Sequence, residues 1–232
     1  CSAVQKLCTR YKSSISQSAL RHALSIASRQ GHANLVAVLI ERGADPDAAD
    51  SEGWTPLRAA AWAGHATTVR VLFERGAQVD ASDTEGRTAL RAAAWAGHEE
   101  VVRLLLNAGA QVDGEDKQGR TPLIAAAYMG HADIVTALLD AGARPDHVDC
   151  EGRTALSVAV LSVACRSTDD NSKKCRPVFS RRRSKQEEPI YENKQNGTLD
   201  GDDNEAVETV TILLEYGASV NHQDKEGMTP LL

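Results

Sequence analysis

The phrase LRAAAWAGH occurs at residues 57–65 and again at residues 90–98. The two copies lie 33 residues apart, and nine identical residues at a fixed offset are very improbable by chance. The same offset relates shorter phrases of the form Thr-Pro-Leu or Thr-Ala-Leu, and one aspartate precedes each of them. These aspartates are Asp50, Asp83, Asp116, Asp149 and Asp224. The chain is therefore built from repeats of 33 residues, and the fifth repeat carries an insertion.

Each repeat predicts a turn followed by two short helices. In the unit 116–148, Gly119 suits a turn that needs positive φ, Thr121 suits an N-cap, and Pro122 suits the first helical position. The pair Gly130-His131 separates the first helix from a second one, which carries an apolar stripe. This stripe consists of Ile134, Val135, Leu138 and Leu139. Neither helix can bury its apolar residues alone, so the units are expected to stack.

A period of 33 residues with Thr-Pro-Leu at its start resembles the ankyrin repeat. The resemblance implies an all-α ankyrin-repeat solenoid over residues 17–232, preceded by an N-terminal segment, 1–16, that could form a helix or partial cap. The predicted repeats are 17–49, 50–82, 83–115, 116–148, 149–223 and a partial 224–232. The family usually has histidine after Thr-Pro-Leu, whereas this chain has Arg58, Arg91, Ile124 and Ser157. Any hydrogen bond of that histidine must be made in another way or be lost.

The amino-acid composition argues against several classes of function. The formal net charge is −6, which argues against nucleic acid as the main partner. Five irregularly spaced cysteines favour reduced thiols and a cytoplasmic location. No apolar segment reaches the roughly 20 residues that cross a bilayer. The chain begins at Cys1 without methionine, and we expect it to be a fragment of a longer protein.

The sequence shows no sign of catalysis, a cofactor or a metal. It contains neither a G-x-S-x-G nucleophile motif nor a P-loop. His32, His65, His98 and His131 recur in Gly-His pairs. Equivalent residues of packed helices lie about 8–10 Å apart, too far to share one zinc ion. We expect each histidine instead to make a local hydrogen bond in the turn before the second helix.

A binding face follows from the period. The resemblance implies that the residue before Thr-Pro-Leu and the two residues before Gly-His line a concave groove that binds protein. On this sequence the candidates are Trp54, Trp62, Arg87, Trp95, Arg120, Tyr128, Met129 and Arg153. Tryptophan and arginine are enriched at binding hot spots, and arginine pairs with carboxylates through two parallel bonds. In the alternative interpretation, the aromatic residues only cover the alanine-rich helices of the next repeat.

The insertion at 166–204 is predicted to be disordered, because it is polar and divided into a basic and an acidic half. It is either an inert loop or a regulatory one. Ser184 follows three arginines and suits a kinase, and Tyr191 with Asn193 resembles a motif that SH2 adaptors bind once phosphorylated. The basic cluster at 173–185 could direct the chain to the nucleus. Asn221 resembles an ankyrin asparagine that an oxygenase hydroxylates.

These observations favour a non-catalytic, monomeric scaffold or adaptor that binds other proteins. The sequence of these repeats is similar to that of the repeats in large intracellular ankyrin scaffolds. This resemblance implies a role in endosomal trafficking of membrane cargo. Two alternatives stay open at this point. The repeats could be the recognition or regulatory part of a larger enzyme or NTPase, or they could be a structural spacer.

Overall fold

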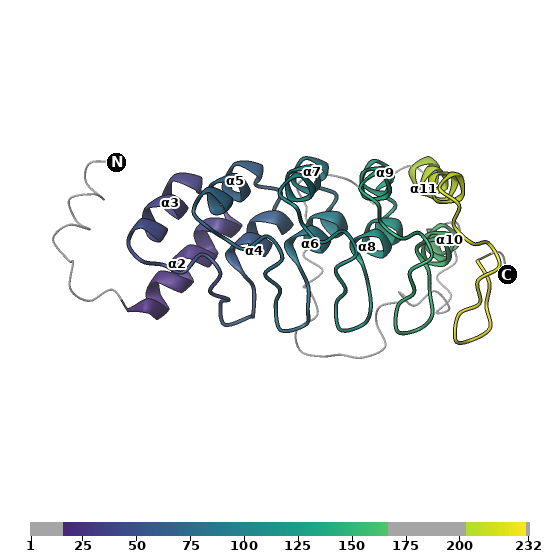
Figure 1. Ribbon diagram of the computed structural model, residues 1–232, viewed down its shortest axis with the longest axis horizontal. Coiled ribbons are helices and arrows are strands. Elements are labelled where there is room, and N and C mark those ends of the chain that lie inside the picture. Colours follow the sequence, from purple (N-terminus) through teal and green to yellow (C-terminus); the bar gives the residue numbers. More distant parts are fainter. Residues whose placement is uncertain (1–15, 167–202, 231–232) are drawn as a thin grey trace.

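The computed structural model describes residues 16–166 and 203–230, and every regular element in these ranges is a helix. The helices form two parallel rows, with a row of loops projecting beside them (Figure 1). The inner row consists of α2 (Gln17–Arg29), α4 (Pro56–Trp62), α6 (Ala89–Ala96), α8 (Pro122–Met129) and α10 (Ala155–Arg166). The outer row consists of α3 (Ala33–Glu41), α5 (Ala66–Glu74), α7 (Glu99–Asn107), α9 (Ala132–Asp140) and α11 (Asp203–Glu215). The prediction of an all-α solenoid is confirmed.

The inner helices begin where the repeated threonine predicts. The hydroxyl of Thr121 accepts a hydrogen bond from the backbone N–H of Ile124 at 3.4 Å, and Pro122 occupies the first turn. Thr55 and Thr88 cap α4 and α6 in the same way. An N-cap satisfies a backbone donor that has no partner within its helix. Gly130 then ends α8 in the left-handed conformation, with φ of 80°, where glycine avoids the Cβ penalty.

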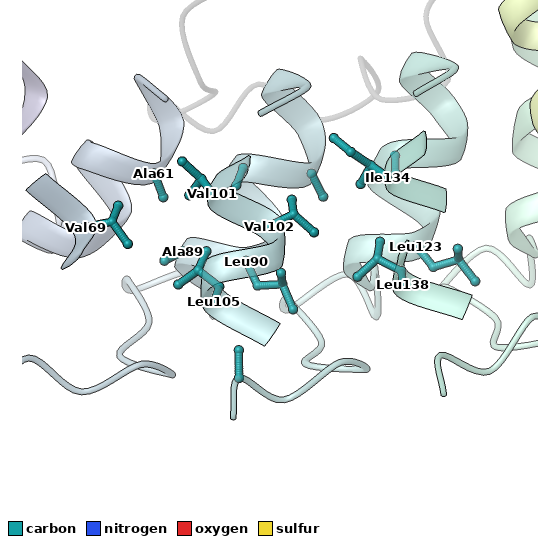
Figure 2. Close-up of a cluster of buried hydrophobic side chains, with 14 of the residues drawn as sticks. Ala61, Val69, Ala89, Leu90, Val101, Val102, Leu105, Leu123, Ile134 and Leu138 are labelled. Carbon is teal, nitrogen blue, oxygen red and sulfur yellow. The ribbon is translucent and has the colours of Figure 1, made fainter. Parts of the chain in front are cut away.

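The core lies between the two rows and is continuous along the array. Leu90 and Leu123 from the inner row meet Leu105 and Leu138 from the outer row, and all four are almost fully buried (Figure 2). The inner helices are lined with alanines, which allow neighbouring backbones to approach closely. Each inner helix contacts the next one along the row. Every unit therefore buries its apolar surface against its neighbours, as expected of a repeat array.

The loops are joined to one another by an aspartate near the end of each repeat. Asp80 Oδ1 accepts a hydrogen bond of 2.9 Å from the backbone N–H of Gln111 in the next repeat. The same bond recurs from Asp47, Asp113 and Asp146. The 33-residue period places each aspartate acceptor opposite the equivalent backbone donor of the next repeat. Successive loops are therefore held in the same relative position along the array.

The two helices of the fifth repeat are longer than those of the fourth repeat. α10 has 12 residues and α11 has 13, whereas α8 has 8 and α9 has 9. α10 ends at Arg166 and α11 begins at Asp203, so both helices reach the edges of the predicted insertion. Val160 and Val163 of α10 line an apolar pocket together with Val207 and Val210 of α11. The two edges of the predicted insertion are therefore helical, while residues 167–202 lie outside the described residues, as do residues 1–15.

Candidate functional site

Three predicted aromatic residues occupy the same place in successive repeats. Trp62 is the last residue of α4, and Trp95 and Tyr128 are next to last in α6 and α8. The rings of Trp95 and Tyr128 stack with centroids 5.4 Å apart and an interplanar angle of 21°. All three side chains are half-buried, as is the neighbouring Met129. The array thus brings together residues that lie 33 positions apart, while their role in binding stays a prediction.

A fourth member of this series was missed by the sequence interpretation. Leu161 on α10 lies 33 residues after Tyr128, and it is 38% exposed. Extending the period by one more unit would have found it. We call Trp62, Trp95, Tyr128, Met129 and Leu161 the ladder face. Two exposed apolar residues of the loops, Val148 and Met228, also belong to the C-terminal half of the array.

Trp54 was expected on the binding surface, but it packs inside the array and is 7% exposed. The guanidinium of Arg58 lies 3.6 Å from its ring centroid, and that of Arg29 lies 5.3 Å away. Its ring also meets Trp62 edge to face, with centroids 5.9 Å apart. Trp54 therefore packs against Trp62 and exposes little of its own surface to a partner.

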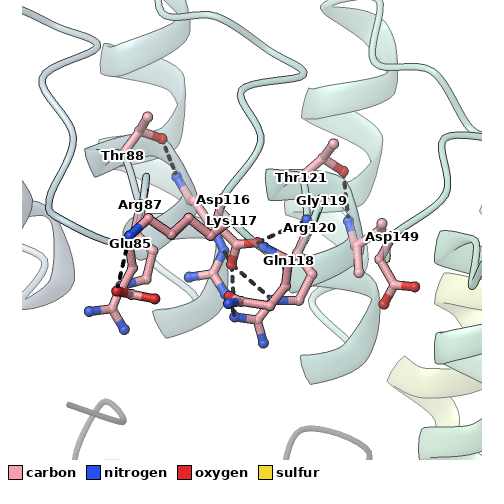
Figure 3. A network of polar contacts seen from close by, with 12 residues as sticks. Glu85, Arg87, Thr88, Asp116, Lys117, Gln118, Gly119, Arg120, Thr121 and Asp149 are labelled. Carbon is pink, nitrogen blue, oxygen red and sulfur yellow. Dashed lines mark hydrogen bonds and ion pairs between the residues drawn. The ribbon is translucent and has the colours of Figure 1, made fainter. Parts of the chain in front are cut away.

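The three loop arginines are held by the aspartates of their own loops. Arg87 Nε donates to Asp83 Oδ2 at 2.7 Å. Arg120 Nε donates to Asp116 Oδ2 at 2.8 Å (Figure 3). Arg153 makes the same bond to its own loop aspartate, Asp149, at 2.9 Å. Only 9%, 16% and 11% of these arginine side chains are exposed. These arginines are thus held by their own loops, and their role in binding a partner stays a prediction.

Each loop aspartate is the centre of a turn. Asp116 Oδ1 accepts hydrogen bonds from the backbone N–H groups of Gln118 and Arg120, at 2.9 and 3.0 Å. The equivalent pair of bonds recurs at Asp50, Asp83, Asp149 and Asp224. This geometry explains why one aspartate opens every unit of the sequence.

Arg58 and Arg91 take over the position where the family usually has histidine. Arg58 Nη1 lies 3.1 Å from Asp83 Oδ2, and Arg91 Nε lies 3.2 Å from Asp116 Oδ2. Both arginine side chains are almost fully buried, and each aspartate belongs to the next repeat along the chain. A buried ion pair therefore couples neighbouring repeats at this position. The sequence showed the substitution, but the new partner became visible only in the fold.

The Gly-His histidines also join neighbouring repeats, which corrects the expectation of a local bond. The Nε2 atom of His98 donates to the carbonyl of Trp62 at 3.0 Å, 36 residues earlier. His65 and His131 make the equivalent bond to the preceding repeat. The imidazole of His98 also packs against Gly64, where an added Cβ would come within 2.6 Å of the ring. Stacking of the repeats places each histidine ring beside the C-terminal end of the first helix of the preceding repeat. The hydrogen bond from the histidine therefore joins two repeats.

The protonation of His98 is expected to weaken the array in mild acid. Burial lowers the pKa of His98 below 6.5, the nearby charge of His65 lowers it further, and the bond to Trp62 opposes this shift. Since the pKa of the unfolded chain is higher, unfolding takes up a proton as the pH falls through this window, and stability is lost. We therefore expect urea midpoints to fall between pH 7.5 and 5.5 by less in His98→Gln than in the wild type. An equal fall of the urea midpoint in His98→Gln and in the wild type would contradict this prediction.

The described part of the chain is acidic. Residues 16–166 and 203–230 contain 15 Lys and Arg residues and 25 Asp and Glu residues, a formal net charge of −10. Exposed glutamates recur near the loop tips, among them Glu52, Glu115, Glu151 and Glu226. Lys117 is also exposed there and lies 3.6 Å from Glu85. The loops therefore present more negative than positive charge.

The remaining predicted sites are modification sites. Asn221 is exposed in the loop that follows α11. Ser184, Tyr191 and the basic cluster at 173–185 lie outside the described residues. Among the residues that the structure places, no three His, Cys, Asp or Glu side chains come together as metal ligands would. In the same ranges, no helix combines the length and apolar character needed to span a membrane.

Two rows of short helices joined by loops in a common register define a helical repeat protein that stacks similar units. The comparison with protein families gives the particular family. A family described as Ankyrin repeats (3 copies) matches residues 1–83, 24–116, 75–149 and 112–169. The chain belongs to the ankyrin repeat family, whose members generally mediate protein–protein interactions. No curated protein matches the chain.

Proposed function

We propose that this array is a non-catalytic scaffold or adaptor that binds a peptide or domain of another protein on the ladder face. The observation that carries the proposal is the series of half-buried Trp62, Trp95 and Tyr128 at one position of successive repeats. Aromatic side chains in such positions supply rigid contact area at a low cost in conformational entropy. The loop arginines are already bonded to the aspartates of their own loops. The aromatic rings are therefore the main candidates for contact with a partner protein.

The proposal extends to a cellular setting. The similarity to large intracellular ankyrin scaffolds such as ankyrin repeat domain-containing protein fifty supports a cytoplasmic role in endosomal trafficking of membrane cargo. Phosphorylation at Ser184 or Tyr191 would regulate it, with an SH2 adaptor as partner at the tyrosine. Hydroxylation of Asn221 and nuclear entry through the basic cluster remain predictions of the sequence. Peptide masses of the protein from cells test each modification directly.

Truncating the ladder face is expected to abolish partner binding. The double variant Trp62→Ala/Trp95→Ala removes two rings, and a tryptophan hot spot contributes about 2 kcal/mol or more, about 30-fold in affinity for each. Proximity labelling with the wild type and the variant measures the loss. Leu35→Ala on α3 is the matched control, because Leu35 is an exposed apolar residue of the outer row.

A loss of partners is interpreted only if the double variant stays folded. Its helical circular dichroism and its midpoint of thermal unfolding show whether it does. Trp62 contacts Trp54, so the less invasive Trp95→Phe serves as a second variant. Recovery of the same partners in the same amounts by the folded double variant would show that the ladder face is not the binding site.

A further inference from the structure

Arg29 holds, in the first repeat, the place that aromatic residues hold in the next three. It lies 33 residues before Trp62 and is the last residue of α2, as Trp62 is the last residue of α4. Hydrogen bonds of the backbone show the same equivalence. The ring of His65 is bonded to the carbonyl of Arg29 at 3.1 Å. The ring of His98 is bonded to the carbonyl of Trp62 at 3.0 Å. The series along the inner row therefore begins with a cation.

Contacts through one intervening ring join Arg29 to the ladder face. The guanidinium of Arg29 lies 5.3 Å from the ring centroid of Trp54, within the range of a cation–π interaction. The ring of Trp54 lies 5.9 Å, centroid to centroid, from that of Trp62. The positive charge is thus held beside the first aromatic residue of the ladder face.

The guanidinium of Arg29 is only loosely paired. Its side chain is 44% exposed, and its Nη2 atom lies 3.6 Å from one carboxylate oxygen each of Asp50 and Glu52. Arg87 and Arg120 are held much more closely, at 2.7 and 2.8 Å from the aspartates of their loops. Exposed ion pairs of this kind contribute little to stability, and Glu52 is itself 65% exposed. A carboxylate of a partner can therefore replace Glu52 and bind the guanidinium through two parallel hydrogen bonds.

The two ends of the series differ in chemistry. Arg29 begins it, the stacked rings of Trp95 and Tyr128 form its middle, and the exposed Leu161 ends it. Complementary charges favour a partner and like charges reject one. Since the described residues carry a formal net charge of −10, a uniformly acidic segment would be repelled. A partner gains most from a carboxylate at one end and apolar side chains along the rest, which also fixes its orientation along the array.

We propose that Arg29 and the ladder face together bind a segment of a partner protein that has an acidic residue beside a cluster of apolar residues. The acidic residue pairs with Arg29, and the apolar side chains lie on the ladder face. This inference rests on the proposed function, and it names the chemistry and the orientation of the partner.

Selection from a random peptide library tests the proposal. Linear peptides displayed on phage are selected on the wild-type array, on Arg29→Gln and on Arg70→Gln. Arg70 is an exposed arginine of α5 in the outer row, so its variant is the matched control for the loss of one positive charge. The wild type and Arg70→Gln should enrich peptides with aspartate or glutamate beside apolar residues. On Arg29→Gln the apolar residues should remain and the preference for an acid should disappear.

Titration calorimetry with one selected peptide measures the contribution of Arg29. Arg29→Gln should weaken binding about three- to tenfold, because a half-exposed ion pair is partly desolvated when the partner binds. Glu52→Gln should strengthen binding, since Glu52 competes for the same guanidinium. A peptide whose acid is replaced by lysine should bind the wild type weakly and should regain affinity for Arg29→Glu.

Three results would overturn the proposal. They are enrichment of basic peptides, a preference for acid that persists in Arg29→Gln, and no gain of affinity from the charge reversal. Self-association of the array that Trp95→Ala/Tyr128→Ala abolishes would also overturn it, because the ladder face would then bind a second copy.

The two proposals can fail separately. If the selected peptides lose affinity in the folded Trp95→Ala/Tyr128→Ala variant but show no preference for acid, the ladder face binds protein and only the role of Arg29 fails. If cellular partners persist in the folded Trp62→Ala/Trp95→Ala variant, the proposed function itself fails.

Discussion

Replacing Asp116 with asparagine is expected to lower the free energy of unfolding by about 3–5 kcal/mol. The side chain of Asp116 is fully buried, and its Oδ2 atom meets both Arg91 of the preceding repeat and Arg120 of its own loop. Asparagine has almost the same shape but no charge, so two guanidinium groups lose the carboxylate that balances them. Breaking a buried ion pair in this way costs far more than removing both partners. Urea denaturation followed by circular dichroism measures the loss.

Two further variants identify the cause of that loss. Glu208→Gln on α11 is the matched control, since it neutralises an exposed carboxylate and should change stability by less than about 0.5 kcal/mol. Arg91→Met in the Asp116→Asn background removes one of the two stranded charges and should recover part of the stability. A cost at Asp116 no larger than at Glu208, or no recovery in the double variant, would show that the pair does not couple the repeats.

Replacing Gly64 with alanine should lower the free energy of unfolding by about 2–4 kcal/mol, the second largest effect on stability that we expect. Its φ of 74° disfavours any side chain, and the added Cβ would lie 2.6 Å from the ring of His98. The ring must then move and give up its bond to the carbonyl of Trp62. The cost combines backbone strain of about 1–2 kcal/mol, overpacking and a lost hydrogen bond of about 1 kcal/mol.

Gly76→Ala separates these contributions. Gly76 has a φ of 88°, but a methyl group added there would have no other atom within 4 Å beyond its own chain neighbours. This control should therefore show the backbone strain alone. In a double-mutant cycle, His98→Ala should offset part of the cost of Gly64→Ala, because it removes the ring that the methyl group meets. Equal losses at Gly64 and Gly76 would contradict the contact between repeats.

The sequence predicted the features that repeat every 33 residues. The threonine caps, the glycines of the turns and the common position of Trp62, Trp95 and Tyr128 all follow from the period, because each copy has the same local environment. Leu161 obeys the same rule and was missed only because the series was ended one repeat early. Local chemistry repeated in register is therefore sufficient for the fold and for the position of the ladder face.

The burial of individual side chains could not be predicted in this way. Trp54 and Arg87 hold the same position in adjacent repeats, yet one packs between arginines and the other bonds to its own loop. The environment of Trp54 depends on Arg29 of the previous repeat and on Arg58 of its own helix. Such combinations across repeats are set by three-dimensional packing, and a single sequence contains no direct record of them.

The buried arginines of the inner row also give the rod a direction. Arg58 and Arg91 tie the second repeat to the third and the third to the fourth, whereas Ile124 and Ser157 carry no charge at the same position. Under mechanical load, the junctions on the C-terminal side would thus have less electrostatic resistance to separation. Separation would begin on the C-terminal side of the fourth repeat and would leave the second, third and fourth repeats as the last part to come apart.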